Sequence, residues 1–252
     1  MNGRPYSLPS DQSPDDPRCS PGGTPPGLSE APEEVAGVFG GALEQARRYA
    51  QLLATDGVAR GLIGPRESER LWDRHLLNCA VVAELLPERG VLVDIGSGAG
   101  LPGLVLAMLR PSLEVILLEP LLRRSVFLEE CVAELGLSNT TVLRARAEEK
   151  AAAHIKADVA TARAVAPLGR LVGWAAPLLR PRGELLAIKG RSAAEEIEAA
   201  RDVLSRLGVR SAEVLQAGHG RVVSATTVVR VVMGGRGREE RAVAQRSRRG
   251  MA

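Results

Sequence analysis

Short apolar segments alternate with helical ones after Gly90, and this alternation constrains the fold of the 252-residue chain more than any other feature. Five of these segments read as strands: VLVDIG, EVILLEP, TTVLRARAEE, ADVATARAV and ELLAIKG. Strands that alternate with helices predict a parallel sheet with right-handed crossovers. Two last strands, at about 209–216 and 222–233, have only a GHG turn between them, which predicts a hairpin and one antiparallel strand. The sequence therefore predicts an α/β protein.

Proline and glycine mark several expected boundaries. Pro65 is expected to open a helix in its first turn, and Gly136 to end one. A helix is expected from Pro167 to about Leu179, and a turn at 181–183 then leads into the ELLAIKG strand.

Composition divides the chain into four parts. Residues 1–32 are rich in Pro, Ser, Gly and Asp, which predicts a disordered N-terminal extension. Apolar residues at three- and four-residue spacing then predict N-terminal helices over 33–89, packed on a core domain at 90–235. Residues 236–252 carry six arginines against two glutamates and are expected to be a basic, disordered tail. Such a tail either contacts RNA or is simply solvated.

Several classes of protein are excluded by what the sequence lacks. No apolar run reaches about 18 residues, so no membrane span is expected. The N-terminus has no apolar segment of the kind that secretory signals contain. The three cysteines form no Cys-x-x-Cys pair and the three histidines have no metal-ligand spacing. We therefore expect a cytoplasmic protein with reduced thiols and no metal.

A glycine-rich loop follows the first predicted strand. Gly96, Gly98 and Gly100 form a G-x-G-x-G pattern, and from Gly98 the spacing also fits the dinucleotide pattern G-x-G-x-x-G. A strand, a glycine turn and a helix together bring backbone N–H groups close to a ligand. The alternative is a tight turn that binds nothing.

Acidic residues near this loop favour a methyl donor over a dinucleotide. Asp94 would repel a pyrophosphate, but it can orient the loop and attract the amino group of a methionine moiety. Glu119, at the end of the second strand, suits ribose hydroxyls in either cofactor. Ala147 and Glu148 follow the third strand, where an adenine edge would lie. No Tyr-x-x-x-Lys pair follows the loop, so dehydrogenase chemistry is not supported and S-adenosylmethionine is favoured.

The ordered segments resemble one known family. VDIGSGAGLPGLVLAMLRP, LLRRSVFLEECVAELGL, RARAEE, ATARAVAPL and LLAIKG are together similar to the 16S ribosomal RNA guanine-N7 methyltransferase G family, also called glucose-inhibited division protein B. The resemblance runs from about Leu52 to Val232 and includes RLWDRHLLNC before the glycine loop. It implies a Rossmann-like methyltransferase fold. Together with the seven strands predicted above, it leads us to expect a seven-stranded, mostly parallel sheet with one antiparallel strand and an N-terminal helical extension. It also implies S-adenosylmethionine as cofactor.

The resemblance also implies roles for individual residues. Donor contacts are expected at Gly96, Leu101, Ala147, Glu148 and Arg163, beside Asp94, Gly98, Gly100 and Glu119 from the loop argument. Candidate contacts to RNA are Arg74, His75, Arg123, Arg124 and Lys189. The alternatives are that His75 is a partly buried histidine with its hydrogen bonds satisfied, and that Lys189 has a structural role facing a helix. The chain departs from the family in two places. GLIGPRE replaces a usual Asn-Leu-Thr segment, and Leu122-Arg123-Arg124 replaces Gly-Lys-Arg.

The implied reaction needs no catalytic side chain. Guanine N7 carries a lone pair and no proton, so it can attack a sulfonium methyl group without a general base. Catalysis is then mostly alignment, and Arg163 and Lys189 are expected to face carboxylate or phosphate. A net charge of +3 suits a nucleic-acid partner. The resemblance implies that this partner is 16S ribosomal RNA or the small ribosomal subunit, and we expect the protein to be a monomer. The alternatives are a small-molecule methyltransferase and a non-catalytic RNA-binding protein of the same fold.

Overall fold

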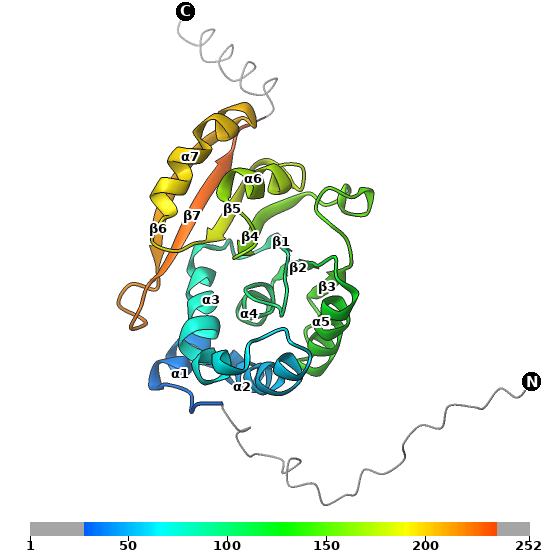
Figure 1. Ribbon diagram of the computed structural model, residues 1–252, viewed down its shortest axis with the longest axis vertical. Coiled ribbons are helices and arrows are strands. Elements are labelled where there is room, and N and C mark those ends of the chain that lie inside the picture. Colours follow the sequence, from blue (N-terminus) through cyan, green and yellow to red (C-terminus); the bar gives the residue numbers. More distant parts are fainter. Residues whose placement is uncertain (1–27, 236–252) are drawn as a thin grey trace, which may run out of the picture.

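A seven-stranded sheet runs through the computed structural model, which describes residues 28–235 (Figure 1). The strands are β1 Gly90–Ile95, β2 Leu113–Leu118, β3 Thr140–Leu143, β4 Ala157–Arg163, β5 Leu179–Ile188, β6 Val209–Ala217 and β7 Thr226–Met233. Their order in the sheet is β3-β2-β1-β4-β5-β7-β6. Only β7 runs against its neighbours β5 and β6, and the other pairings are parallel. This confirms the prediction of a mostly parallel, Rossmann-like sheet with one antiparallel strand.

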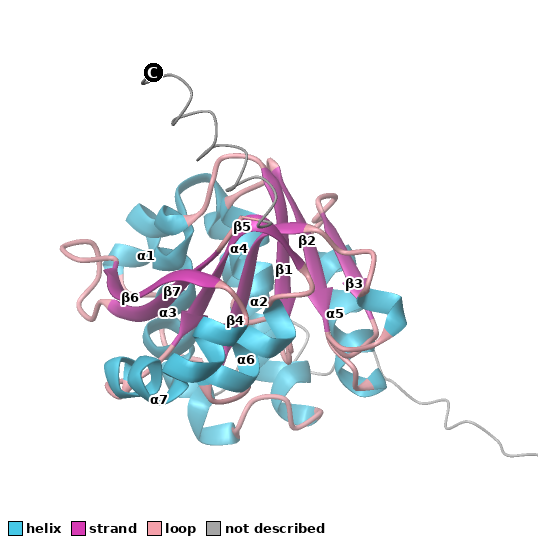
Figure 2. Ribbon diagram, turned by 90° about the horizontal axis from the view of Figure 1, so that it is seen from above, coloured by secondary structure: helices cyan, strands magenta, loops and turns pink. Residues whose placement is uncertain are grey.

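Helices cover both faces of the sheet (Figure 2). They are α1 Glu33–Phe39, α2 Leu43–Leu52, α3 Asn78–Ala80, α4 Gly103–Leu109, α5 Leu122–Glu134, α6 Leu168–Ala175 and α7 Ala193–Arg206. Successive strand residues point to opposite faces. Leu92 packs with α4, α5 and the helices before β1, whereas Val93 packs with α6 and α7. Both faces of the central strands are therefore buried, which explains their nearly continuous apolar sequences.

The order of the strands reverses between β1 and β4. β1, β2 and β3 follow one another toward one edge of the sheet, and the chain then returns to place β4 on the other side of β1. Ligands of open α/β sheets bind at such a reversal, beyond the carboxyl ends of the strands. The glycine loop follows β1 at this point, and Arg163 is the last residue of β4.

The segment before β1 is helical, as the spacing predicts, but it is not one regular helix. Tighter and wider helical turns connect or extend the α-helices at Gly40–Ala42, Leu53–Gly57, Pro65–Arg70, Leu71–Leu77 and Val81–Leu85, and another lies at Lys150–Ala152. Pro65 does open its helical turn. The described chain begins at Leu28, and Ser29 already contacts this segment because its carbonyl oxygen accepts a hydrogen bond from Trp72 Nε1 (3.1 Å).

Two predicted boundaries in the second half are wrong in detail. Helix α6 ends at Ala175, earlier than predicted, and β5 begins at Leu179. The predicted turn at 181–183 thus lies inside β5, where the pairing with β4 shifts between Ala157 and Val159. A proline and a glycine mark a break in regular backbone but do not distinguish a turn from a bulge.

No helix in the described part of the chain is long and apolar enough to cross a membrane. The predicted tail at 236–252 and most of the predicted extension at 1–32 lie outside the described residues.

Candidate functional site

The glycine loop is held by hydrogen bonds to the ends of strands β1 and β2. The N–H groups of Gly96 and Ser97 donate to the carbonyl oxygen of Leu118 at the end of β2 (2.8 and 3.2 Å). The Ser97 hydroxyl donates to the carbonyl oxygen of Asp94 (3.0 Å). Gly100 has a φ of +99°, and a Cβ there would lie 2.3 Å from Leu104 Cδ1. Both its conformation and its surroundings therefore require glycine.

Asp94 lies directly beneath this loop and is fully buried. Its Oδ2 accepts a hydrogen bond from the N–H of Gly103 (3.1 Å), the first residue of α4, and its Oδ1 accepts one from Thr161 Oγ1 (3.1 Å). Thr161 is its register partner on β4. Burial raises the pKa of Asp94 to about 6, against the lowering effect of these hydrogen bonds. Asp94 thus joins β1, β4 and the first residue of α4, and its role in orienting the loop stays a prediction.

Glu119 is the second buried carboxylate of the site. Its Oε2 accepts a hydrogen bond from the N–H of Gly98 (2.9 Å), and its Oε1 accepts one from the N–H of Leu121 (3.0 Å). Arg124 Nη1 lies 3.8 Å from Oε2. Each carboxylate oxygen can accept a second hydrogen bond, so Glu119 can still receive hydroxyl groups from a ligand.

Two neighbouring cavities open beside the loop and share Gly96, Pro120 and Val165. The larger has a volume of about 550 Å³, and its lining includes His75, Gly98, Leu101, Glu119, Arg124 and Arg163. The smaller, of about 100 Å³, lies against Ile95, Leu118, Ala147, Glu148 and Trp174. The two cavities therefore bring together most of the residues that were expected to hold the donor.

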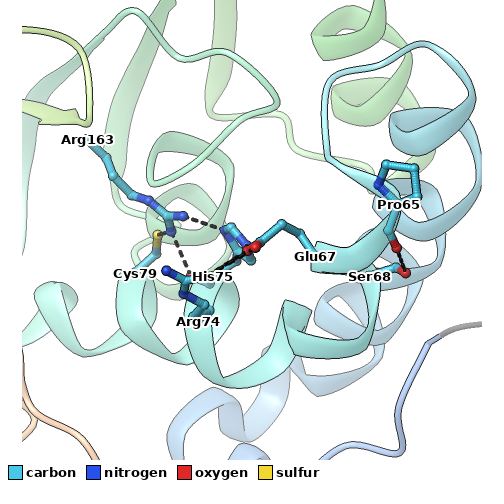
Figure 3. A network of polar contacts seen from close by, with 7 residues as sticks. All are labelled: Pro65, Glu67, Ser68, Arg74, His75, Cys79 and Arg163. Atoms are coloured by element: carbon cyan, nitrogen blue, oxygen red, sulfur yellow. Dashed lines mark hydrogen bonds and ion pairs between the residues drawn. The ribbon is translucent and has the colours of Figure 1, made fainter.

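Arg163 is bound by the helical segment before β1 (Figure 3). Its Nη2 contacts His75 Nδ1, and its Nη1 donates to Cys79 Sγ (3.3 Å). The other ring nitrogen of His75, Nε2, lies 2.9 Å from Glu67 Oε2. Within the described chain the contacts of Arg163 are thus with His75 and Cys79, and the expectation that it faces a carboxylate or phosphate of a bound ligand stays a prediction.

Lys189 does face a carboxylate, as expected. Its Nζ contacts Glu196 Oε2 (2.7 Å) and the carbonyl oxygen of Ala166 (2.8 Å). Glu196 Oε2 also accepts the N–H of Leu168, the first residue of α6 (2.9 Å). Lys189 lines neither cavity. It ties the end of β5 to α7 and to the chain just before α6.

The other basic candidates lie at different places. Arg74 is exposed and pairs with Glu67 (3.1 Å), beside His75. Arg124 lines the larger cavity and faces Glu119. Arg123 is exposed, and its side chain has no hydrogen-bond or ion-pair partner among residues 28–235. No group of His, Cys, Asp and Glu residues that could hold a metal ion occurs in the same range.

Three residues of the site were not singled out from the sequence. Thr161 is a polar residue inside a buried strand, and this pattern could have indicated it. Tyr49 occupies one of the apolar positions of the predicted N-terminal helices, and Glu67 is the last residue of the GLIGPRE segment that departs from the family pattern. Each of the three contacts a residue outside its own helix or strand. The spacing of apolar residues along a helix or strand does not reveal such contacts.

Tyr49 connects the N-terminal helices to the glycine loop. Its side chain is fully buried in α2, and its hydroxyl donates to the carbonyl oxygen of Ala99 (2.6 Å). We expect Tyr49→Phe to lower the free energy of unfolding by about 1–3 kcal/mol, because a buried carbonyl loses its partner. Urea unfolding at pH 7 measures this, with an unchanged m-value as control. A stability equal to that of the unmodified protein would show that the hydroxyl does not support the loop.

Comparisons with known proteins show which family the chain belongs to. A family model described as rRNA small subunit methyltransferase G matches residues 42–223. Ribosomal RNA small subunit methyltransferase G of Thermobifida fusca is 60% identical over 205 residues, which are 81% of this chain and 85% of the relative. The chain belongs to the rRNA small subunit methyltransferase G family. A second ribosomal RNA small subunit methyltransferase G, from Streptomyces avermitilis, is 56% identical over 82% of this chain and 87% of that relative.

A solved structure supports the fold independently. A SAM-dependent O-methyltransferase from Thermotoga maritima aligns with a TM-score of 0.51 at 15% identity, over 68% of this chain and 71% of that one. At this identity the likeness concerns the fold alone. The family membership confirms the resemblance noted from the sequence, and the alignment confirms the methyltransferase fold.

Proposed function

We propose that this member of the rRNA small subunit methyltransferase G family transfers a methyl group from S-adenosylmethionine to N7 of a guanine in 16S ribosomal RNA. The observation that carries the proposal is the paired cavity at the strand reversal, with two buried carboxylates beneath and beside a glycine loop. The family membership supports the class of reaction. We expect the enzyme to act as a monomer in the bacterial cytoplasm, without a metal.

The residues present fit the proposed donor. Glu119 keeps free acceptor capacity at the wall of the larger cavity, where it can receive the ribose hydroxyls. Ala147 and Glu148 line the smaller cavity, where they can meet the adenine edge. Gly96 lies between the two cavities, and a Cβ there would come within 3.1 Å of Val165. When bound, the donor supplies a methyl group already activated on a sulfonium ion.

The protein's contribution to the reaction is mainly to align the reactants. The guanine N7 lone pair carries no proton, so its attack on the methyl group needs no general base. Alignment of this kind can supply about 7–11 kcal/mol of the barrier. Positive charge moves to the purine during the transfer. The Arg163 cation is held by its bonds to His75 and Cys79 instead of being free to approach the ring.

The acceptor must be presented outside a regular helix. N7 lies on the major-groove edge, which side chains do not reach in A-form RNA. The target guanine is therefore a loop base or a displaced one. Arg74, Arg123 and Arg124 are the candidate phosphate contacts, and of these Arg123 alone is fully available. His75 is occupied on both ring nitrogens, so we place it with Arg163 instead of with the RNA.

The deciding assay follows the transfer of a labelled methyl group. The purified protein is incubated with labelled S-adenosylmethionine and 16S RNA, either free or within small subunits, and the modified base is mapped. We expect label on N7 of one guanine. Label on small metabolites instead would favour a small-molecule methyltransferase. Failure of the protein to bind the donor in calorimetry would favour a non-catalytic RNA-binding protein.

Gly96→Asp tests the position of the donor. We expect loss of measurable donor binding, because the new carboxylate enters the shared wall of the two cavities and φ at this position is +68°. Gly136→Asp is the matched control: its φ is +63°, but it lies after α5 and a Cβ there meets nothing within 4 Å. Isothermal calorimetry compares the two. Equal loss of affinity in both variants would mean that backbone conformation alone explains the effect.

A further inference from the structure

Arg163, His75 and Glu67 form a chain of contacts that starts at the larger cavity. Arg163 comes from the end of β4, His75 from the Leu71–Leu77 turns and Glu67 from the Pro65–Arg70 turns (Figure 3). The His75 side chain is 11% exposed and that of Glu67 is 34% exposed. Residues 88 positions apart in sequence thus meet at the cavity wall.

The contacts determine which ring nitrogen of His75 carries a proton. A guanidinium can only donate, so His75 Nδ1 must accept from Arg163 with its lone pair. Nε2 then carries the proton of the neutral ring and donates it to Glu67. The ring is therefore a neutral bridge between a carboxylate and a guanidinium. A second proton, on Nδ1, would point at the guanidinium and break the bridge.

We infer that His75 and Glu67 are positioning residues that hold the Arg163 guanidinium toward the donor side of the cavity. The two terminal nitrogens of Arg163 donate hydrogen bonds to three acceptors: His75 Nδ1, the His75 carbonyl oxygen at 3.5 Å and Cys79 Sγ at 3.3 Å. A guanidinium has five N–H groups, so it keeps donors for an anionic group in the cavity. The donor's carboxylate is the group of that chemistry, and this part rests on the proposed function.

The charges around His75 act on it in opposite directions. Burial and the positive charges of Arg163 and Arg74 lower the pKa of His75, whereas the hydrogen bond and negative charge of Glu67 raise it. In turn, the hydrogen bond from His75 lowers the pKa of Glu67. Cys79 touches Arg163 from α3 and is buried as a free thiol. The neutral ring is thus favoured on balance, as the bridge requires.

Nitrogen-15 NMR of the histidine rings tests the bridge without any donor. The chain has only three histidines, so the His75 signals are identified by their absence from His75→Gln. We expect the Nε2–H tautomer at pH 7 and a pKa below the ordinary value of about 6.5. Glu67→Gln, which removes a charge but keeps an acceptor, should lower this pKa further, and Arg163→Met should raise it. The Nδ1–H tautomer, or a pKa that neither variant moves, would overturn the inference.

Donor binding tests the consequence for the site. We expect His75→Leu to weaken the binding of S-adenosylmethionine about ten- to a hundredfold, since a hydrogen bond to a charged group is lost. His75→Gln should recover most of this loss, because an amide can both accept from Arg163 and donate to Glu67. His219→Leu, an exposed histidine in the turn before β7, is the matched control. Equal affinities for His75→Leu and the unmodified protein would overturn the inference.

The two proposals fail in different ways. If the unmodified protein does not bind the donor, the proposed function is wrong, and the NMR titration still decides whether the bridge exists. If the donor binds but His75→Leu has no effect, only the positioning role is wrong. Thermal unfolding of each variant separates loss of the fold from loss of affinity.

Discussion

Gly103→Ala is expected to lower the free energy of unfolding by about 3 kcal/mol and to abolish donor binding. Alanine normally stabilises a helix over glycine by about 1 kcal/mol, and α4 begins at this residue. Here the added Cβ would lie 2.3 Å from Leu117 Cδ2 and 2.6 Å from Asp94 Oδ2. Both neighbours are fully buried, so neither can move into open space. The clash therefore outweighs the helix propensity, and it displaces the carboxylate beneath the loop.

Gly173→Ala is the control for this substitution. Gly173 is exposed in α6, and a Cβ there meets nothing within 4 Å. We expect it to leave stability unchanged or raise it by up to about 1 kcal/mol. Urea unfolding and donor calorimetry of both variants provide the comparison. If Gly103→Ala were as stable as Gly173→Ala, the close packing of α4 against Asp94 and β2 would be wrong.

Asp94→Asn is expected to separate stability from donor binding. The amide can replace both hydrogen bonds, because its oxygen can accept from Gly103 N–H and its nitrogen can donate to Thr161 Oγ1. The fold should therefore be retained. The loss of a negative charge beneath the loop should weaken the binding of the cationic donor by on the order of tenfold. Calorimetry at pH 8, where Asp94 is ionised, measures this difference.

The raised pKa of Asp94 also predicts how the free energy of unfolding changes with pH. The folded protein has an Asp94 pKa of about 6, above the 3.8 of an unperturbed aspartate. Between these values the folded state holds a proton that the unfolded chain has released, so stability falls as the pH rises through this window. Above pH 6 this fall in the free energy of unfolding is complete and amounts to about 3 kcal/mol.

The Asp94→Asn variant should not show this fall in the free energy of unfolding, because asparagine does not titrate. The difference in unfolding free energy between the variant and the unmodified protein should therefore shift in favour of the variant between pH 4 and pH 7. Urea titrations across this range, without donor, measure the shift. Parallel curves for the two proteins would contradict the raised pKa of Asp94.

Much of the fold could be predicted because it depends on local patterns. The strand and helix segments after Gly90 follow from apolar runs and their period, since burial on a sheet face selects apolar residues. The sequence predicts a turn where β5 instead has an irregular pairing with β4, since Pro181 and Gly183 disturb regular backbone pairing in either case. The segment around Glu67 is helical, as the spacing of apolar residues predicts. Its tighter and wider helical turns depend on packing against other parts of the chain, which the spacing does not reveal.

Within the site, local sequence patterns are enough to identify the glycine loop and the carboxylates Asp94 and Glu119, because these residues lie within or next to β1 and β2. What these residues contact depends on how distant segments pack together. Tyr49 reaches the loop, Thr161 pairs with Asp94 and His75 turns Arg163 toward the cavity. These contacts join residues from 50 to 88 positions apart. Local periodicity specifies which side of an element is buried, whereas the order of strands and the packing of helices determine which side chains meet there.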